Sequence, residues 1–289
     1  MYKSIRLLRI AISLVALAVP TWALLAGYDS VFVRMQILTS LLTGASVCLL
    51  FWLVITLIYG RIYCSTACPL GTFTDCAGAA YRAIRRRRKN FTYCPPSPRT
   101  RVIFVLITLG TMIAGGTLIP TIFDPYSAYA RMVTELIGRP LGLNPHAVMF
   151  TGAALAVALL TATGVVTFGA LRGRLMCNTI CPVGTVLGAV GSKPFFHIEI
   201  DPDRCTNCGE CVHVCKSQCI RLPEKTVYCS RCIVCFDCTA VCPNGAITYK
   251  TGRYRLDMPM MQAVGGNGPA AAQCDSRRCL SRMKSITKK

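Results

Sequence analysis

The sequence predicts an integral membrane α-helical protein, with four transmembrane helices in two repeated hairpins, followed by a small α+β domain. Four apolar stretches, 10–27, 35–60, 102–123 and 147–171, are each close to the length that crosses a bilayer as a helix. The apolar fraction of 53% is high and the charged fraction of 15% is low, which is a membrane profile. A cysteine-rich stretch follows the last apolar segment and predicts the α+β domain.

The first hairpin is expected in residues 1–60. Three basic residues precede the uncharged stretch 10–27, which predicts the first helix. A cleaved signal peptide has the same basic start and apolar stretch, and this is the alternative interpretation. Asp29 and Arg34 mark a short outer loop, after which the span 35–60 returns the chain to its first side.

The second hairpin is expected in residues 102–171, with an outer loop between its two helices. The preceding loop, 61–101, contains a basic run from Arg82 to Lys89 and a proline-rich break after Cys94. Such basic runs are typical of solvated linkers or of contacts with lipid headgroups.

The distribution of basic residues predicts the orientation. The start, the 61–101 loop and the segment after 171 contain 3, 9 and 17 Lys and Arg residues, whereas the two outer loops contain 1 and 2. By the positive-inside rule, both termini and the α+β domain are cytoplasmic, in a multi-pass protein of a bacterial inner membrane. The net charge of +20 is thereby explained without nucleic acid, and no aromatic-interleaved basic motif of an RNA-binding module is present.

Residues 205–243 contain the spacing C-x2-C-x2-C-x3-C twice, and the second copy ends in Cys242-Pro243. This spacing is typical of bacterial ferredoxins with two [4Fe–4S] clusters, in which the fourth cysteine of each run binds the other cluster. A zinc site needs only four ligands in two pairs and has no use for the crossed fourth cysteine. A register that uses Cys229 in place of Cys232 is the weaker alternative, because only the standard register pairs with Cys242-Pro243. The expected ligands are Cys205, Cys208, Cys211 and Cys242 for cluster 1, and Cys232, Cys235, Cys238 and Cys215 for cluster 2.

The ferredoxin-type domain is expected in residues 196–250. Residues 196–200 alternate like a short strand, and 243–249 have a turn followed by a second strand-like segment. The cysteines must be reduced to bind clusters, which also favours the cytoplasmic side. The tail, 251–289, is rich in Gly, Ala and Arg and is expected to be disordered, with Cys274 and Cys279 in it.

The motif G-R-x-x-C-x-T-x-C-P-x-G-T occurs twice, at residues 60–72 and 173–185, each time directly after a predicted hairpin. The membrane part is therefore predicted to be a duplication, which would bring the two C-x3-C-P loops near each other at the cytoplasmic surface. An additional metal or cluster site shared by the two loops is expected, with a redox disulfide pair or unliganded thiols as the alternatives. A radical-SAM site would need a further cysteine at position 71, which is Gly71. The four cysteines concerned are Cys64, Cys68, Cys177 and Cys181.

Four membrane helices, two C-x3-C-P loops and a carboxyl-terminal two-cluster run together resemble the NapH/MauN-type membrane-bound polyferredoxins, which are related to the C-terminal half of NosR-type proteins. The resemblance extends from about residue 5 to residue 250. Two departures stand out: Lys216 occupies a position where the family usually has Pro, and Cys219 and Cys229 are additional cysteines.

The resemblance implies an electron-transfer component of a quinol dehydrogenase system. Its partners would be membrane lipid, the quinone pool and a redox protein such as a cytochrome, a flavoprotein or a ferredoxin-like subunit. Quinol would bind between helices near a membrane face, and outer-loop residues would accept its protons. The alternative function is an accessory protein for metalloenzyme assembly that uses the C-x3-C-P cysteines. The candidate proton acceptors are Asp124, Tyr126, Glu135 and His146.

Overall fold

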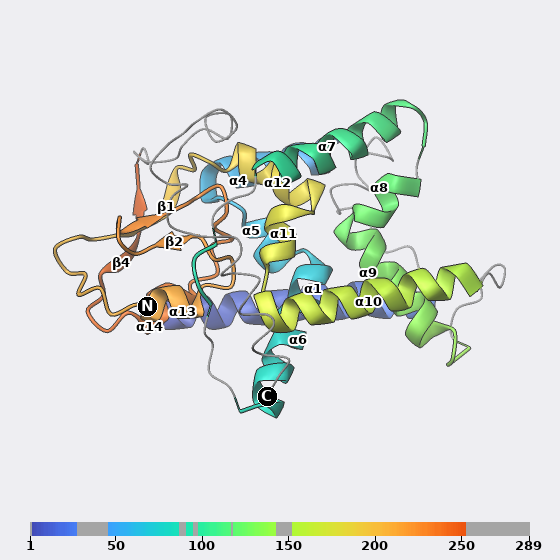
Figure 1. Ribbon diagram of the computed structural model, residues 1–289, viewed down its shortest axis with the longest axis horizontal. Helices are drawn as coiled ribbons and strands as arrows, with labels where there is room; N and C mark the ends of the chain where they lie inside the picture. Colours follow the sequence, from blue (N-terminus) through green and yellow to red (C-terminus); the bar gives the residue numbers. More distant parts are fainter. Residues whose placement is uncertain are drawn as a thin grey trace.

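The computed structural model describes residues 2–27, 46–86, 91–94, 98–116, 118–142 and 152–252 (Figure 1). The predicted first outer loop, the beginning of the second span, His146 and nearly all of the predicted tail lie outside these residues.

Four helices rich in apolar residues, two of them long, form one part of the molecule. They are α1 (Tyr2–Ala26), α4 (Ser46–Tyr59), α7 (Pro98–Ile113) and α10 (Gly152–Arg172). Among the described residues, α1 and α10 are long and apolar enough to cross a membrane, and α4 is a shorter apolar helix. The predicted first and fourth spans thus correspond to helices of spanning length.

The predicted third span, 102–123, is not one helix. Helix α7 ends at Ile113, Gly115 takes a left-handed conformation with φ of +77°, and a separate short helix α8 (Leu118–Phe123) follows. The left-handed residue cannot continue a right-handed helix, and glycine adopts it without steric cost. The single-helix prediction was therefore wrong, because it followed apolarity and gave too little weight to the glycines.

The predicted second outer loop also contains helices. Helix α9 (Pro125–Val133) continues into a π-helical turn (Thr134–Gly138), and α9 packs against α1, α6 and α10. Asp124 begins α9, since its carboxylate accepts a hydrogen bond of 2.7 Å from the backbone N–H of Ser127. This helix is amphipathic, and its buried face includes Tyr129 and Met132.

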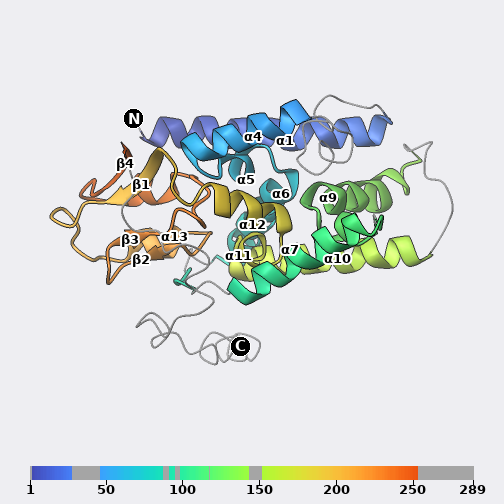
Figure 2. The ribbon, with the colours of Figure 1, turned by 90° about the horizontal axis from the view of Figure 1, so that it is seen from above.

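The two C-x3-C-P segments fold alike. Each has a short helix, α5 (Ile62–Thr66) or α11 (Leu175–Thr179), then a second cysteine, then a longer helix. The longer helices are α6 (Pro69–Ile84) and α12 (Pro182–Val190), and each has proline in its first turn. Helix α6 packs on α1 and α10, whereas α12 packs on α4 and α7, so each contacts one helix from either predicted hairpin (Figure 2).

The α+β domain lies at one end of the long helices, beside the amino-terminal end of α1 (Figure 1). Its strand β1 (Phe196–Ile200) covers the residues predicted as a strand and pairs antiparallel with β4 (Ile247–Thr251), with Ile198 opposite Tyr249. Two-residue strands β2 (Ile220–Arg221) and β3 (Thr226–Val227) form a second pair. The helices α13 (Glu210–Val214) and α14 (Asp237–Val241) lie within the two cysteine runs, each just before the fourth cysteine, and contact each other.

Candidate iron–sulfur centres

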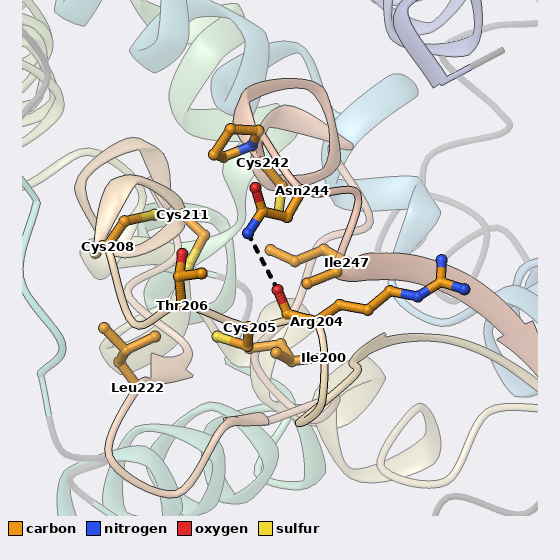
Figure 3. Close-up of a pocket in the computed structure, with 13 residues that line it drawn as sticks. Ile200, Arg204, Cys205, Thr206, Cys208, Cys211, Leu222, Cys242, Asn244 and Ile247 are labelled. Atoms are coloured by element: carbon orange, nitrogen blue, oxygen red, sulfur yellow. Dashed lines mark hydrogen bonds between the residues drawn. The ribbon is translucent and has the colours of Figure 1, made fainter.

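The four cysteines predicted for cluster 1 line one small cavity (Figure 3). Three come from the loop before α13 and from α13 itself, and Cys242 comes from the loop after α14. Asn244 holds the two loops together, since its Nδ2 donates a hydrogen bond of 3.3 Å to the carbonyl oxygen of Arg204. The rest of the lining is mostly apolar and includes Ile200, Leu222 and Ile247. Thiolates around an apolar cavity suit an iron–sulfur cluster, whose ligands are cysteine thiolates.

The cysteines predicted for cluster 2 gather deeper in the domain. Burial raises the pKa of Cys238 well above its usual value, and the neighbouring Cys235, Cys215 and Cys232 raise it further. These thiols therefore lie within electrostatic range of one another. Cys219 joins them, because its Sγ lies 3.6 Å from the Sγ of Cys215. The hydrogen bond from Cys219 lowers the pKa of Cys215 to about 7 although burial opposes this shift.

Within the described part of the chain, no three or more His, Cys, Asp or Glu side chains are close enough together to hold a single metal ion.

The cysteines of the two C-x3-C-P loops also meet. Cys64, Cys68, Cys177 and Cys181 all line a cavity of about 210 Å³. Burial raises the pKa of Cys177 to about 11, although the charge of Arg174 lowers it. Buried thiols of this kind stay protonated at neutral pH unless a bound metal deprotonates them. The predicted proximity of the two loops is thus present in the structure.

Two arginines of the repeated motif cross from one copy to the other. Arg61 Nη1 donates a hydrogen bond of 2.6 Å to Asn178 Oδ1 in the second copy. Arg174 Nη1 donates to the carbonyl oxygen of Cys64 in the first copy. A Cβ on Gly71 would lie 2.8 Å from the carbonyl oxygen of Cys64 and 2.9 Å from Arg174 Nη1. A Cβ on Gly184 would clash with the carbonyl oxygen of Cys177 and lie 2.9 Å from Arg61 Nη2. The repeated glycine is therefore required because the backbone of its own loop and the other copy's arginine together occupy the space of a side chain.

Other repeated residues of the motif stabilise the local structure of their own copy. Gly60 and Gly173 have φ of +80° and +62° and turn the chain after α4 and α10. The hydroxyls of Thr66 and Thr179 each donate 3.0 Å hydrogen bonds to the carbonyl four residues earlier. Cys181 begins α12, and its Sγ accepts a hydrogen bond of 3.3 Å from the backbone N–H of Gly184. The duplicated motif thus encodes two loops that support each other.

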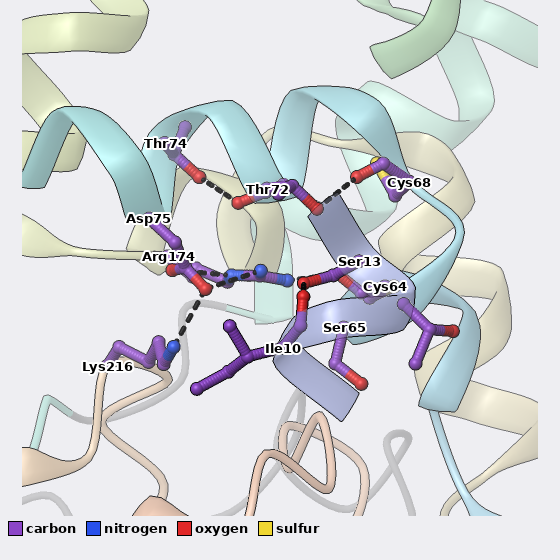
Figure 4. A network of polar contacts seen from close by, with 12 residues as sticks. Ile10, Ser13, Cys64, Ser65, Cys68, Thr72, Thr74, Asp75, Arg174 and Lys216 are labelled. Carbon is purple, nitrogen blue, oxygen red and sulfur yellow. Dashed lines mark hydrogen bonds and ion pairs between the residues drawn. The ribbon is translucent and has the colours of Figure 1, made fainter. Parts of the chain in front are cut away.

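A chain of ion pairs connects α6, which follows the first C-x3-C-P loop, to the α+β domain (Figure 4). Asp75 binds Arg174 through two contacts of 2.7 and 3.0 Å and also binds Lys216 Nζ at 2.7 Å. Lys216 reaches Asp237 at 3.5 Å, and Asp237 binds Arg6 of α1 at 2.8 Å. Burial alone would raise the pKa of Asp75, but the charges of Arg174 and Lys216 hold it well below its usual range. Asp75 therefore stays ionised.

Sequence reasoning did not identify Asp75 as a functional residue. A signal was present, because Asp75 is the one acidic residue among nine basic residues between positions 61 and 101. In the sequence, its partner Lys216 stands out only as a departure from the family pattern.

The C-x3-C-P site and the cluster 2 site share one apolar core. Ile233 and Cys235 belong to the same buried cluster of side chains as Cys64 and Cys68. Arg61 also spans the two sites, since its Nη1 donates to the carbonyl oxygen of Ser230 at 3.1 Å while its Nη2 lies 3.7 Å from Cys64 Sγ. Cys211 of the cluster 1 set in turn shares a second buried core with Cys215 and Cys238 of the cluster 2 set, and Cys208 of the cluster 1 set is exposed. The sites are therefore arranged in series.

Comparison with known protein families first defines the class. Residues 41–91 and 149–198, which contain the two C-x3-C-P loops, match a family model described as a 4Fe-4S binding domain. Residues 196–217, which contain the first cysteine run, match a second model with the same description. With the cysteine-lined cavities, these matches define an iron–sulfur electron-transfer protein of ferredoxin type.

Individual relatives then give the family. Ferredoxin-type protein NapH of Escherichia coli (strain K12) is 32% identical over 232 residues, 74% of this chain and 72% of the relative. NapH of Haemophilus influenzae is 29% identical over 220 residues, 73% of this chain and 68% of the relative. The methylamine utilization ferredoxin-type protein MauN of Paracoccus denitrificans is 28% identical over 213 residues, 73% of this chain and 66% of the relative. The chain belongs to the NapH/MauN family of ferredoxin-type proteins, which confirms the resemblance. No solved structure matches.

Proposed function

We propose that this protein transfers electrons one at a time between the membrane quinone/quinol pool and a redox partner protein. Three [4Fe–4S] clusters would be bound, two in the α+β domain and one shared by the C-x3-C-P loops. The observation that carries the proposal is the cavity at these loops, because it places four cysteines against an apolar space that reaches the surface of the long helices. When bound, the clusters supply one-electron transfer, and the chain supplies their positions.

The lining of this cavity supports a quinone ring beside the cluster, on the side formed by α8 and α10. Ile122 of α8 and Phe168 of α10 line it and are 37% and 43% exposed on the outside of the helices. A ring could therefore enter from the bilayer while its hydrocarbon tail stays in lipid.

The serial arrangement of the sites supports a path for electrons. The C-x3-C-P cysteines share an apolar core with Cys235 of the cluster 2 set. The cluster 1 set lies beyond it and reaches the surface at Cys208. We infer that electrons leave to the partner protein from the cluster 1 end. The proposed cytoplasmic position of this end rests on the distribution of basic residues.

Asp124 is less suited to accept protons than the sequence suggested. Its carboxylate already accepts hydrogen bonds from the backbone and the hydroxyl of Ser127, at 2.7 and 2.9 Å. The carboxylate thus holds the start of α9, and we assign it a structural role.

The test is to fill the cavity. Gly164 lines it, and a Cβ there would meet no atom within 4 Å. We expect Gly164→Leu in lipid nanodiscs to slow the reduction of the clusters by a quinol at least about tenfold, which corresponds to about 1.4 kcal/mol. Reduction by dithionite should be unchanged.

The matched control is Gly110→Leu on α7, where a Cβ would likewise meet nothing within 4 Å. This glycine does not line the cavity. Equal quinol-dependent rates in the two variants would contradict the proposed quinone site.

A further inference from the structure

The two cysteine runs of the α+β domain have the same spacing but different surroundings. Cys242 is followed by Pro243 and, four positions on, by Ala246, whereas Cys215 is followed by Lys216 and, four positions on, by Cys219. We propose that Lys216 and Cys219 raise the reduction potential of cluster 2, Lys216 through its charge and Cys219 by donating a hydrogen bond to the Cys215 sulfur. This inference rests on the proposed presence of cluster 2.

Cys219 is placed to donate a hydrogen bond rather than to bind iron. Its side chain is 1% exposed, and its Sγ lies 3.6 Å from Cys215 Sγ. Two thiolates so close would have to share one iron, whereas each iron of the cluster takes its own cysteine. Once Cys215 binds iron it is a thiolate and has no hydrogen, so the S–H of Cys219 is the donor. Cys232, a second member of the cluster 2 set, is also within hydrogen-bonding reach of Cys219.

A hydrogen bond to a ligand sulfur favours the reduced cluster, because that form carries one more negative charge. The equivalent position next to cluster 1 is Ala246, which has no donor side chain. The effect is therefore specific to cluster 2.

Lys216 acts on the same cluster through its charge. Its Nζ lies 2.7 Å from Asp75 and 3.5 Å from Asp237, and Asp237 stands between the ligands Cys235 and Cys238. The other cations of this network are Arg174, which binds Asp75, and Arg6, which binds Asp237. Removing Lys216 would leave the cluster 2 site one charge more negative. The low dielectric of the buried network makes such a charge effective.

The surroundings of cluster 1 differ in this respect too. The basic residue in its lining is Arg204, which is 68% exposed and lies 3.6 Å from Asp201. Water screens this charge. Cluster 2, in contrast, lies in an apolar and buried environment that by itself disfavours an added electron. Lys216 and Cys219 offset that cost at the centre that lies between the C-x3-C-P site and cluster 1.

The test is an anaerobic redox titration of the full chain in detergent, followed by EPR. We expect the midpoint potential of one cluster to fall in Cys219→Ala and in Lys216→Met, and to fall further in the double variant. The other cluster signals should keep their potentials, and iron content should not change. Cys219→Ser keeps a hydrogen-bond donor, and Lys216→Arg keeps the positive charge. Both variants should therefore have a midpoint potential close to that of the wild type.

The control is Cys229→Ala, another buried thiol of the same domain, which should leave all midpoints unchanged. The proposal is overturned if no midpoint moves, if all move equally, or if Cys219→Ala loses about four iron atoms, because Cys219 would then be a ligand. If the variants show the expected fall in midpoint potential but quinol does not reduce the clusters of the wild type, the proposed function is refuted and this inference stands.

Discussion

The ion pair between Asp75 and Arg174 should be the strongest polar link between α6 and the second C-x3-C-P loop. Arg174 is 1% exposed, and Asp75 is its carboxylate partner at 2.7 and 3.0 Å. Asp75→Asn keeps the size of the side chain but removes its charge. The buried guanidinium then has no compensating anion at this position, and Lys216 loses its closest partner as well.

Breaking a buried pair by removing one partner costs about 3–5 kcal/mol, because the other charge stays buried. At about 2–4 °C per kcal/mol, the apparent Tm should fall by about 6–20 °C. The matched control is Glu199→Gln, which removes an exposed pair with Lys250 at 3.2 Å. An exposed pair contributes less than about 1 kcal/mol, so the control should lower Tm by no more than a few degrees.

The assay is thermal unfolding in mild detergent, followed by size-exclusion chromatography under anaerobic conditions. Because Arg174 and Lys216 hold the pKa of Asp75 below its usual range, its stabilising effect is complete above about pH 4 and is lost below it. The difference between wild type and Asp75→Asn should therefore be constant from about pH 5 to pH 8. A Tm loss no larger than that of the control would refute this reasoning.

Three further predictions concern the loops and α9. Gly184→Ala would place a Cβ against the carbonyl oxygen of Cys177 and 2.9 Å from Arg61 Nη2, so we expect a loss of about 1–3 kcal/mol in thermal unfolding, whereas Gly110→Ala should change little. Cys181→Ser should lower the iron content of the anaerobically purified chain from about twelve to about eight per molecule; an unchanged count would exclude a cluster there. Asp124→Ala should destabilise the protein by about 0.5–2 kcal/mol through loss of the α9 cap, with Asp124→Asn close to wild type if the role is capping alone.

The sequence was most informative where a spacing has one chemical meaning. The double C-x2-C-x2-C-x3-C run predicted the crossed ligand sets, and the structure brings Cys242 into the cavity of the first three cysteines. The repeated motif predicted that two loops meet, because a duplicated unit implies a symmetric arrangement. Both predictions rest on patterns of residue types that can be read directly from the sequence.

The sequence was least informative where the structure depends on contacts between residues that are far apart in the chain. Apolarity alone predicted one helix through Gly115, and it could not show that residues of α8 and α9 line the C-x3-C-P cavity. Asp75 and Lys216 are 141 positions apart, and no local pattern relates them. The crossing of Arg61 and Arg174 was likewise hidden, because the repeated motif does not show that each arginine contacts the other copy. These contacts follow from the packing of one repeat on the other.

The most direct test of the central claim is to count iron and acid-labile sulfide in the full chain purified without oxygen, and to record EPR spectra before and after adding quinol. We predict about twelve iron and about twelve sulfide per chain, and reduced-cluster signals that quinol elicits in the wild type. Protein that contains zinc, or no metal, under these conditions would contradict the account.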